Sequence, residues 1–256
     1  MAKSVNWTRE EIIVALNVYC KIPFKTSRAT NPVVMEYAKL LNRTPAALNL
    51  KIGNLGRFDE NLRSQGIVGL GHGSKLDKMV WNEFQEDSEK VIYESEQIIA
   101  RLKNQTLEQS TGIEMYDLPQ GLDRTVITKT RVNQNFFRIA VLVAYNNKCC
   151  ISGVSNVALL EACHISSWKD DVKNRTNPKN GLCMNSFFHR AFDNYLFTVT
   201  PEYRIEIYGK MFDSVKMVDF RQYLEKINGT SIVLPEKFLP DVNLLEKHYE
   251  KYKKTF

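Results

Sequence analysis

An apolar stretch, a turn-rich segment and a helical segment follow one another between residues 157 and 194. The stretch VALLEACHI is short and apolar, which predicts a strand. The segment NPKNG is rich in turn-forming residues, and LCMNSFFHRAFDN has the pattern of a helix. Because consecutive elements with short connections usually pack as neighbours, this order predicts a small unit of strand, loop and helix.

The first hundred residues predict a different, mostly helical region. Thr8, Asn31 and Thr44 each precede a run with apolar residues at helical spacing, and such side chains commonly cap helix N-termini. Pro32 and Pro45 stand at the first helical position, which suits proline. The two helices that begin there are compatible with a helix-turn-helix arrangement, and an ordinary helical hairpin fits the pattern equally well.

These patterns predict an α+β fold in two domains. A helical domain covers residues 1–105, with a long helix over 77–103, and a polar stretch with Gly and Pro at 106–122 is expected to be a linker. A second domain covers 123–256. It is expected to begin with a strand and a helix over 123–150 and to contain two strands around a Pro-Glu turn within 195–210.

The composition is that of an ordinary soluble protein, with 43% hydrophobic and 25% charged residues. The sequence contains no apolar run of the roughly 18 residues that a membrane span needs. The opening segment MAKSVNWTREE lacks the apolar core of a signal peptide, so a cytoplasmic location is expected. The odd number of five cysteines favours reduced thiols.

The net charge of +6 is unevenly distributed. Residues 123–190 contain 10 Lys and Arg against 4 Asp and Glu, whereas the 66 residues that follow are balanced. A local basic surface attracts a polyanion such as nucleic acid, although a solvated charged face would give the same count.

Three polar residues stand out within the strand, loop and helix. His164 ends the expected strand, Asn180 lies in the turn sixteen residues later, and His189 lies on the expected helix nine residues further on. A neutral imidazole can take a proton from water at neutral pH, and a second imidazole can help to hold a divalent cation. An Asn side chain can fix the loop or orient the base. Such a set suits phosphodiester hydrolysis.

This order of residues resembles the HNH endonucleases, whose fold is called ββα-metal. It is most similar to bacterial restriction endonucleases with a helical N-terminal region and a C-terminal HNH domain. The resemblance is carried by the stretches RVNQNFFRIAVLVAYNNKCCISG, LLEACHISSW, RTNPKNGLCMNSFFHRAFDNYLFTV, WTREEIIVALNVYCKIPF and LLNRTPAALNLKIGNLGRFD.

The resemblance implies a role for each motif residue. His164 would be the general base, Asn180 the structural and orienting residue of the catalytic set, and His189 a ligand of the catalytic metal. The metal would be Mg²⁺, with Mn²⁺ as an alternative. The substrate would be double-stranded DNA, cut to 5′-phosphate and 3′-hydroxyl ends in restriction or defence against foreign DNA, and a homodimer could cut both strands.

The chain departs from the family pattern at the second metal ligand. Many relatives place an acidic residue or a second His directly before the base, where this chain has Cys163, and a thiolate is a poor ligand for Mg²⁺. Asp193 is a candidate, because it follows His189 by one helical turn, although it could equally pair with Arg190. Glu161 is a weaker candidate, because its odd offset along the strand predicts the face opposite His164.

The zinc-binding pattern of many relatives is also incomplete. They hold a structural zinc with two Cys-x-x-Cys pairs, and the corresponding positions here read Cys149-x-x-Ser152 and Cys183-x-x-Ser186. Two thiols are too few for such a site, so a structural zinc is not expected.

Basic and polar residues near the motif and on the second helix of the hairpin are candidates for contact with DNA. The loop residues could instead form a solvated surface. The candidates are Arg131, Arg138, Lys169, Lys173, Arg175, Lys179, Lys51, Asn54 and Arg57.

Other readings remain open to different degrees. A DNA-binding or regulatory protein that keeps the fold without cleavage is the main alternative, because of Cys163. A cysteine protease is disfavoured, because adjacent Cys163 and His164 should point to opposite faces of a strand. His72 and His248 are expected at the surface.

Overall fold

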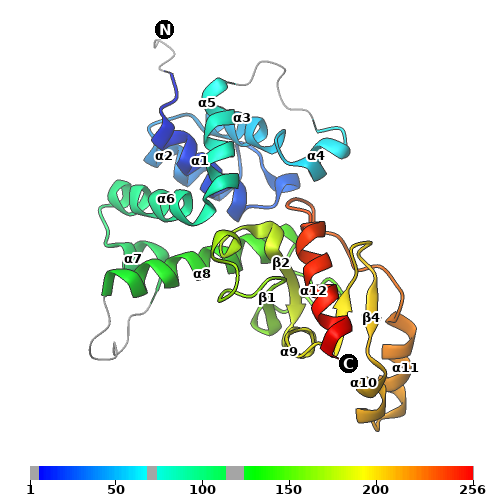
Figure 1. Cartoon of the computed structure of the whole chain (residues 1–256). Helices are drawn as coiled ribbons and strands as arrows, with labels where there is room; N and C mark the ends of the chain where they lie inside the picture. The colour runs from blue at the N-terminus through cyan, green and yellow to red at the C-terminus, as the bar shows by residue number, and fades with distance from the viewer. Residues whose placement is uncertain (1–5, 68–73, 114–123, 256) are drawn as a thin grey trace.

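The computed structural model describes residues 6–67, 74–113 and 124–255. The fold is α+β, with a mostly helical N-terminal part followed by two small sheets and further helices (Figure 1). The N-terminal helices are α1 (Arg9–Lys21), α2 (Pro32–Leu40), α3 (Pro45–Gly56), α4 (Glu60–Ser64), α5 (Lys75–Glu86), α6 (Ser88–Lys103) and α7 (Leu107–Thr111).

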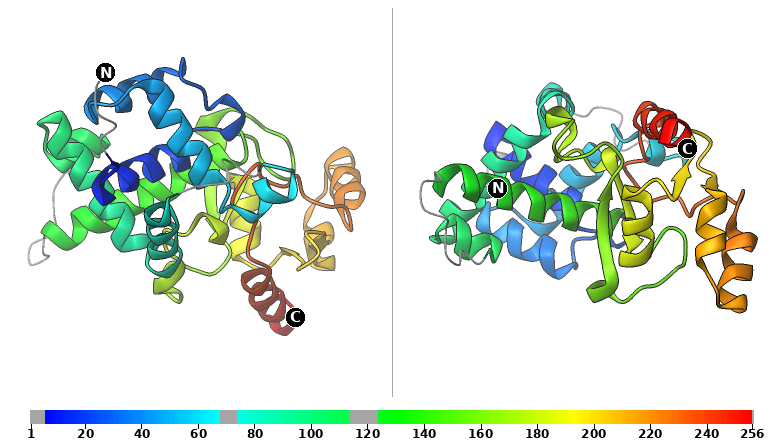
Figure 2. Two further views of the ribbon diagram at one scale, coloured as in Figure 1. Left: turned by 90° about the horizontal axis from the view of Figure 1, so that it is seen from above. Right: turned by 60° about the horizontal axis from the view of Figure 1, so that its bottom comes forward.

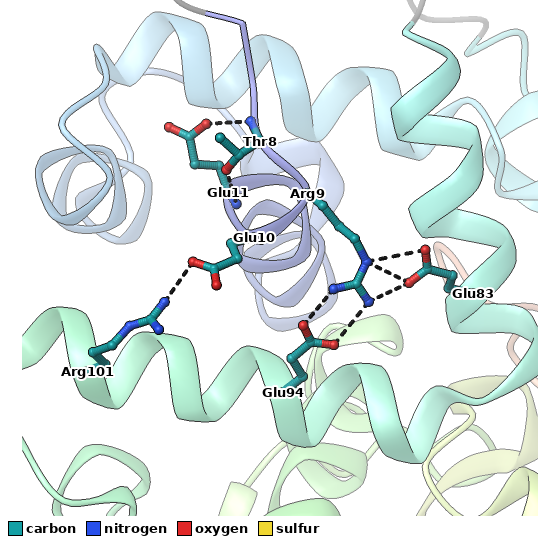
Figure 3. A network of polar contacts seen from close by, with 7 residues as sticks. All are labelled: Thr8, Arg9, Glu10, Glu11, Glu83, Glu94 and Arg101. Carbon is teal, nitrogen blue, oxygen red and sulfur yellow. Dashed lines mark hydrogen bonds and ion pairs between the residues drawn. The ribbon is translucent and has the colours of Figure 1, made fainter.

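Helix α1 is the centre of the N-terminal part, and its residues 12–20 are all buried. Thr8 and Glu11 form a capping box at its start, as the sequence pattern predicts for Thr8. Arg9 donates hydrogen bonds to Glu83 on α5 and to Glu94 on α6, so one guanidinium ties three helices together (Figure 3). The expected caps Asn31 and Thr44 are also present, at α2 and α3.

The long helix expected over residues 77–103 is interrupted. Asp87 leaves the helical conformation, with φ −144° and ψ 77°, and its carboxylate accepts a hydrogen bond from the backbone N–H of Lys90. An Asp that caps the next turn offers the backbone an alternative to a continuous helix. The segment is therefore two helices, α5 and α6, which pack against each other.

Helix α8 (Arg124–Ala144) joins the two parts of the molecule (Figure 1). The strand expected at the start of 123–150 is wrong for the described residues, because the helix begins at Arg124. Lys129 pairs with Glu89 of α6 at 3.0 Å. The helix also packs against α1, α7 and the first sheet.

The first sheet and the helix after it form the expected compact unit. Strands β1 (Leu160–His164) and β2 (Gly181–Asn185) pair antiparallel, and α9 (Ser186–Asp193) follows directly. The prediction that the helix includes residues 182–185 is wrong, because these residues belong to β2. A fully buried run such as Leu182–Met184 has no polar alternation to distinguish strand from helix, and pairing with β1 decides its structure.

Gly181 is required at the start of β2 by the closeness of α8. A Cβ there would lie 2.3 Å from Cγ2 of Val141 and 3.0 Å from Cζ of Phe137. The absence of a side chain therefore lets α8 pack directly on the sheet.

The remaining elements complete the C-terminal part. Strands β3 (Phe197–Val199) and β4 (Ile205–Ile207) form the expected hairpin around the Pro-Glu turn. Helices α10 (Gly209–Ser214) and α11 (Val218–Ile227) lie at the edge of the molecule, away from the N-terminal helices (Figure 2). Helix α12 (Val242–Thr255) packs against β3.

The segment before α12 returns to the N-terminal part. The Lys237 ammonium is fully buried and donates hydrogen bonds to the backbone oxygens of Tyr19, Cys20 and Ile22 at the end of α1. Burial lowers the pKa of Lys237 to about 8. These oxygens carry the negative end of the helix dipole, which an ammonium complements.

The division into two domains stays a prediction. Helix α7 lies within the stretch expected to be a linker, and residues 114–122 of that stretch lie outside the described residues. His72 also lies outside them. None of the helices in the described part of the chain is long and apolar enough to cross a membrane.

Candidate active site

His164 ends β1 with one ring nitrogen already engaged. Its Nε2 lies 2.9 Å from the backbone oxygen of Arg175. A carbonyl oxygen only accepts, so Nε2 carries the proton in the neutral ring. The other nitrogen, Nδ1, then has a free lone pair and is the atom that can act as a base.

The surroundings of His164 favour its neutral form. The ring stacks on Phe137 of α8, with centroids 3.8 Å apart and an interplanar angle of 11°, and Trp168 contacts it edge-on. Burial lowers the pKa of His164 below its ordinary value of 6.5, against a weaker opposing effect of its hydrogen bond to Arg175. The imidazole is therefore unprotonated at neutral pH, as a general base must be.

Asn180 organises the loop between β1 and β2. Its side chain is fully buried, and its Oδ1 accepts a hydrogen bond of 2.8 Å from the backbone N–H of Ser166. Its Nδ2 donates to the backbone oxygens of Ser166 and Asn174, at 3.0 and 3.1 Å. Asn180 thus fixes the loop that places the Arg175 carbonyl against His164, and it makes no direct contact with the imidazole among these bonds.

His189 lies on α9 between two carboxylates. Its Nδ1 contacts Oε2 of Glu161 on β1, and its Nε2 lies 3.4 Å from Oδ2 of Asp193. The hydroxyl of Ser186 donates to the other oxygen of Glu161 at 2.9 Å. His189 thus bridges the two carboxylates, with Nδ1 toward Glu161 and Nε2 toward Asp193.

Strict alternation along a strand would place Glu161 and His164 on opposite faces of β1. Both line a shallow cavity beside α8, together with Arg138 and His189. Short two-stranded ribbons twist strongly, which weakens the separation into two faces. Burial raises the pKa of Glu161, but hydrogen bonds from His189 and Ser186 outweigh it and lower the pKa overall, so this carboxyl is ionised.

Cys163, His189 and Asp193 form a group that could hold a metal ion. One ligand atom from each lies within 4.8 Å of the other two. Cys163 is fully buried, whereas the side chain of Asp193 is 53% exposed. Burial raises the pKa of Asp193 above its ordinary value. The imidazole and carboxylate suit many divalent ions, but the sulfur does not suit Mg²⁺.

A cavity of about 300 Å³ gives access to His189 and Asp193. His164, His189 and Asp193 line it from β1 and α9, and Lys247 and Lys251 line it from α12. These two lysines were not among the site residues predicted from the sequence. Their i, i+4 spacing places them on one face of a helix, but only the folded chain shows that this face meets the cavity.

The basic residues expected near the motif differ in their surroundings. Lys169 and Lys173 are exposed. Arg138 lines the shallow cavity and donates to the backbone oxygen of Val157 at 3.4 Å. Arg131 lies about two turns earlier on α8 and is half-buried. Arg175 donates to the Trp168 oxygen at 2.7 Å, and Lys179 lies 4.0 Å from Glu60.

The N-terminal candidates fit a direct DNA contact less well. Lys51 is buried, and its Nζ lies 2.7 Å from Oδ1 of Asp77. The prediction that Lys51 contacts DNA therefore fits the structure poorly, because the charge of Lys51 is already paired inside the protein. Asn54 and Arg57 are half-buried, and the Arg57 guanidinium lies over the Phe58 ring.

The positions of the incomplete zinc pattern have other contacts. The hydroxyl of Ser152 accepts a hydrogen bond from Asn185 at 3.1 Å, and Ser186 binds Glu161. The five cysteines are all buried and unbridged.

His248 is buried, contrary to the expectation of a surface position. Its ring stacks on Phe192 with centroids 3.7 Å apart, and Nδ1 lies 2.9 Å from the Thr198 hydroxyl. Burial lowers its pKa to about 4. The charged sequence around it, LLEKHYEKYKK, hid its place on the buried face of α12.

Comparison with protein families gives an independent result for this region. Residues 149–200 match the HNH endonuclease family. The matched segment contains both strands of the first sheet, α9 and β3, and it includes His164, Asn180 and His189. The comparisons with curated proteins and with solved structures found no match. The C-terminal part of the chain thus contains an HNH domain, and we use that name for residues 149–200.

Proposed function

We propose that the protein is a metal-dependent endonuclease that cuts double-stranded DNA as part of restriction or defence against foreign DNA. The observation that supports this most is the arrangement of His164. Its Nε2 is held by a backbone oxygen, its Nδ1 is free, and its ring lines the same cavity as His189 and Asp193.

In the proposed reaction, Nδ1 of His164 takes a proton from the attacking water. The Arg175 carbonyl stabilises the resulting imidazolium through Nε2–H, and the stack on Phe137 holds the ring plane. His189 and Asp193 would hold the divalent metal, which supplies positive charge to the phosphate when bound. The resemblance to HNH endonucleases implies that hydrolysis leaves 5′-phosphate and 3′-hydroxyl ends.

The basic segment 123–190 would contact the DNA backbone. Lys169 and Lys173 are exposed on the loop that carries Trp168 and Arg175, and Lys247 and Lys251 add positive charge at the cavity. Helices α2 and α3 would position DNA through Asn54 and Arg57. A homodimer with two HNH domains would cut both strands.

A plasmid assay tests the proposal. Supercoiled plasmid, with and without modified bases, is incubated with the protein in Mg²⁺, Mn²⁺, Co²⁺, Zn²⁺ or a chelator. Nicked or linear DNA in at least one metal and intact DNA with chelator is the expected result. A folded protein that binds DNA but cuts no substrate in any metal would instead support a non-catalytic DNA-binding protein with an HNH fold.

The lowered pKa of His164 predicts an unusual pH dependence of cleavage. A general base works in its neutral form, so the rate falls as pH decreases through its pKa. Because that pKa lies below 6.5, the midpoint of the decrease at saturating metal should lie below pH 6.5, with a fall approaching tenfold per unit at still lower pH. Single-turnover rates on a nicking substrate measure this, and a midpoint above pH 6.5 would contradict it.

Replacing Glu161 by alanine should weaken metal binding. The variant loses the acceptor that keeps the proton of His189 on Nδ1 and directs Nε2 toward Asp193. Loss of such a partner typically lowers metal affinity by about 10–100-fold. Calorimetric titration with Mn²⁺ measures the change. Glu202→Ala, in the exposed turn between β3 and β4, is the matched control and should bind as the unaltered protein does.

A further inference from the structure

We propose that Cys163 is a thiolate ligand of the catalytic metal, and that the site therefore selects a thiophilic divalent ion such as Zn²⁺ or Co²⁺ over Mg²⁺. This inference rests on the proposed nuclease function for the use of the site. The binding of the metal itself can be tested without DNA.

The first argument is position. The sulfur of Cys163, a nitrogen of His189 and an oxygen of Asp193 come from β1 and α9 and lie within 4.8 Å of one another. Ligand atoms around a tetrahedral Zn²⁺, at about 2.0–2.3 Å from the ion, lie roughly 3–4 Å apart. Side-chain movements of about 1 Å would bring the three atoms to such a separation.

The second argument is the orientation of His189. Its Nδ1 contacts Glu161, and its Nε2 faces Asp193, 3.4 Å away. With a cation bound between them, Nε2 and the Asp193 carboxylate would both present lone pairs to that cation. A shared cation would satisfy both groups, and the sulfur of Cys163 borders the same space.

The third argument is the type of donor. Thiolate and imidazole ligands suit Zn²⁺ and related first-row ions, whereas Mg²⁺ prefers oxygen ligands. Three protein ligands leave a fourth position of a tetrahedral ion for water or phosphate, as catalytic zinc sites do. Asp193 and His189, with side chains 53% and 25% exposed, lie toward the cavity and leave that position accessible.

The Cys163 thiol has a competing partner that metal binding would replace. Its Sγ lies 3.7 Å from the backbone oxygen of His164, a weak hydrogen bond. When the ion binds, the thiol releases its proton to solvent and the sulfur becomes an anionic ligand. The step changes no oxidation state and needs no second reactant.

Cobalt provides a direct test, because a thiolate bound to Co²⁺ gives an intense near-ultraviolet charge-transfer band that oxygen and nitrogen ligands do not give. The full-length protein, reduced and freed of metal, is titrated with Co²⁺ alone. One equivalent should produce the band. Cys163→Ala should abolish it and lower Co²⁺ affinity at least about tenfold, while Cys183→Ala, a buried thiol on the paired strand, should keep both.

The outcomes separate the inference from the proposed function. Binding of Co²⁺ without the band, or a band that persists in Cys163→Ala, would overturn the inference. Thermal unfolding of both alanine variants shows that they are folded. Cys163→Asp adds a test in which a property is gained and not lost. The ratio of Mg²⁺ affinity to Co²⁺ affinity should rise at least about tenfold, because an oxygen ligand replaces sulfur. An unchanged ratio would contradict the proposal.

Cleavage is read separately. If the thiolate band is present but no plasmid is cut, the metal site stands and the nuclease proposal fails. If plasmid is cut with Mg²⁺ as well as with Co²⁺ and no band forms, the nuclease proposal stands and the role of Cys163 fails.

Discussion

Replacing His164 by alanine is expected to lower the rate of DNA cleavage by about 10²–10⁴-fold, the usual contribution of a general base. The variant removes Nδ1 of His164, which has no hydrogen-bond partner among the described residues while Nε2 is held by the Arg175 oxygen. Single-turnover cleavage of plasmid DNA at saturating metal measures the loss. Rates that stay within threefold of the unaltered protein would exclude His164 as the base.

The comparison with His189→Ala separates the two histidines. The imidazole of His164 is not one of the proposed metal ligands, so His164→Ala should bind metal normally. His189→Ala removes a ligand and should lose metal affinity together with cleavage. Calorimetry with Co²⁺ gives the first quantity for both variants, and DNA binding in chelator shows that each still recognises its substrate.

Replacing Asn180 by aspartate is expected to destabilise the fold by about 3 kcal/mol, because it leaves two backbone oxygens without their donor and places a fully buried carboxylate against them. The oxygens are those of Ser166 and Asn174. Because the same loop holds the Arg175 carbonyl against His164, cleavage should fall as well. Urea unfolding at pH 7 measures the free energy of unfolding.

Asn156→Asp is the matched control for this change. Asn156 is exposed, and its side-chain oxygen accepts a hydrogen bond from the backbone N–H of Ala158, which an aspartate can also accept. Its effect should stay within about 0.5 kcal/mol, as for most surface substitutions. An Asn180→Asp variant as stable as this control would mean that the loop is not held by the amide.

The N-terminal helices were predictable because their start signals are local. Thr8, Asn31 and Thr44 cap the helices that follow them, and each signal lies within three residues of the group it satisfies. Asp87 carries the same kind of signal. It was overlooked because the apolar periodicity on either side suggested one continuous helix.

Strand β2 could not be predicted in this way. Its residues Leu182–Met184 are buried on every side, so their pattern has no period, and their partner strand lies some twenty residues earlier in the chain. The start of α8 was misread for a related reason. Its β-branched residues, such as Val126 and Ile127, favour strands locally, and packing of the rest of the helix overrides that preference.

In the candidate site, too, local spacing predicted some features, whereas contacts between distant segments could not be predicted. The spacing of His164, Asn180 and His189 predicted that they lie near one another. In the structure His164, His189 and Asp193 line one cavity, and Asn180 holds the loop between β1 and β2. The pairing of Glu161 with His189 depends on the twist of a short ribbon, and the burial of Lys51 depends on Asp77 in another helix. Neither can be read from the residues near them in sequence.

Helix α8 has a consequence for where DNA would be cut. It is a single helix of 21 residues, about 31 Å long, which contacts α6 through Lys129 and stacks Phe137 on His164. Ser88 of α6 also contacts Thr176 in the loop between β1 and β2, with 2.7 Å between the hydroxyls. A rigid helix that is fixed at both ends keeps a constant distance between the two parts of the molecule that it joins. If the N-terminal helices grip DNA, the break should fall a constant number of base pairs from the gripped segment, rather than over the ragged range that a flexible tether would allow.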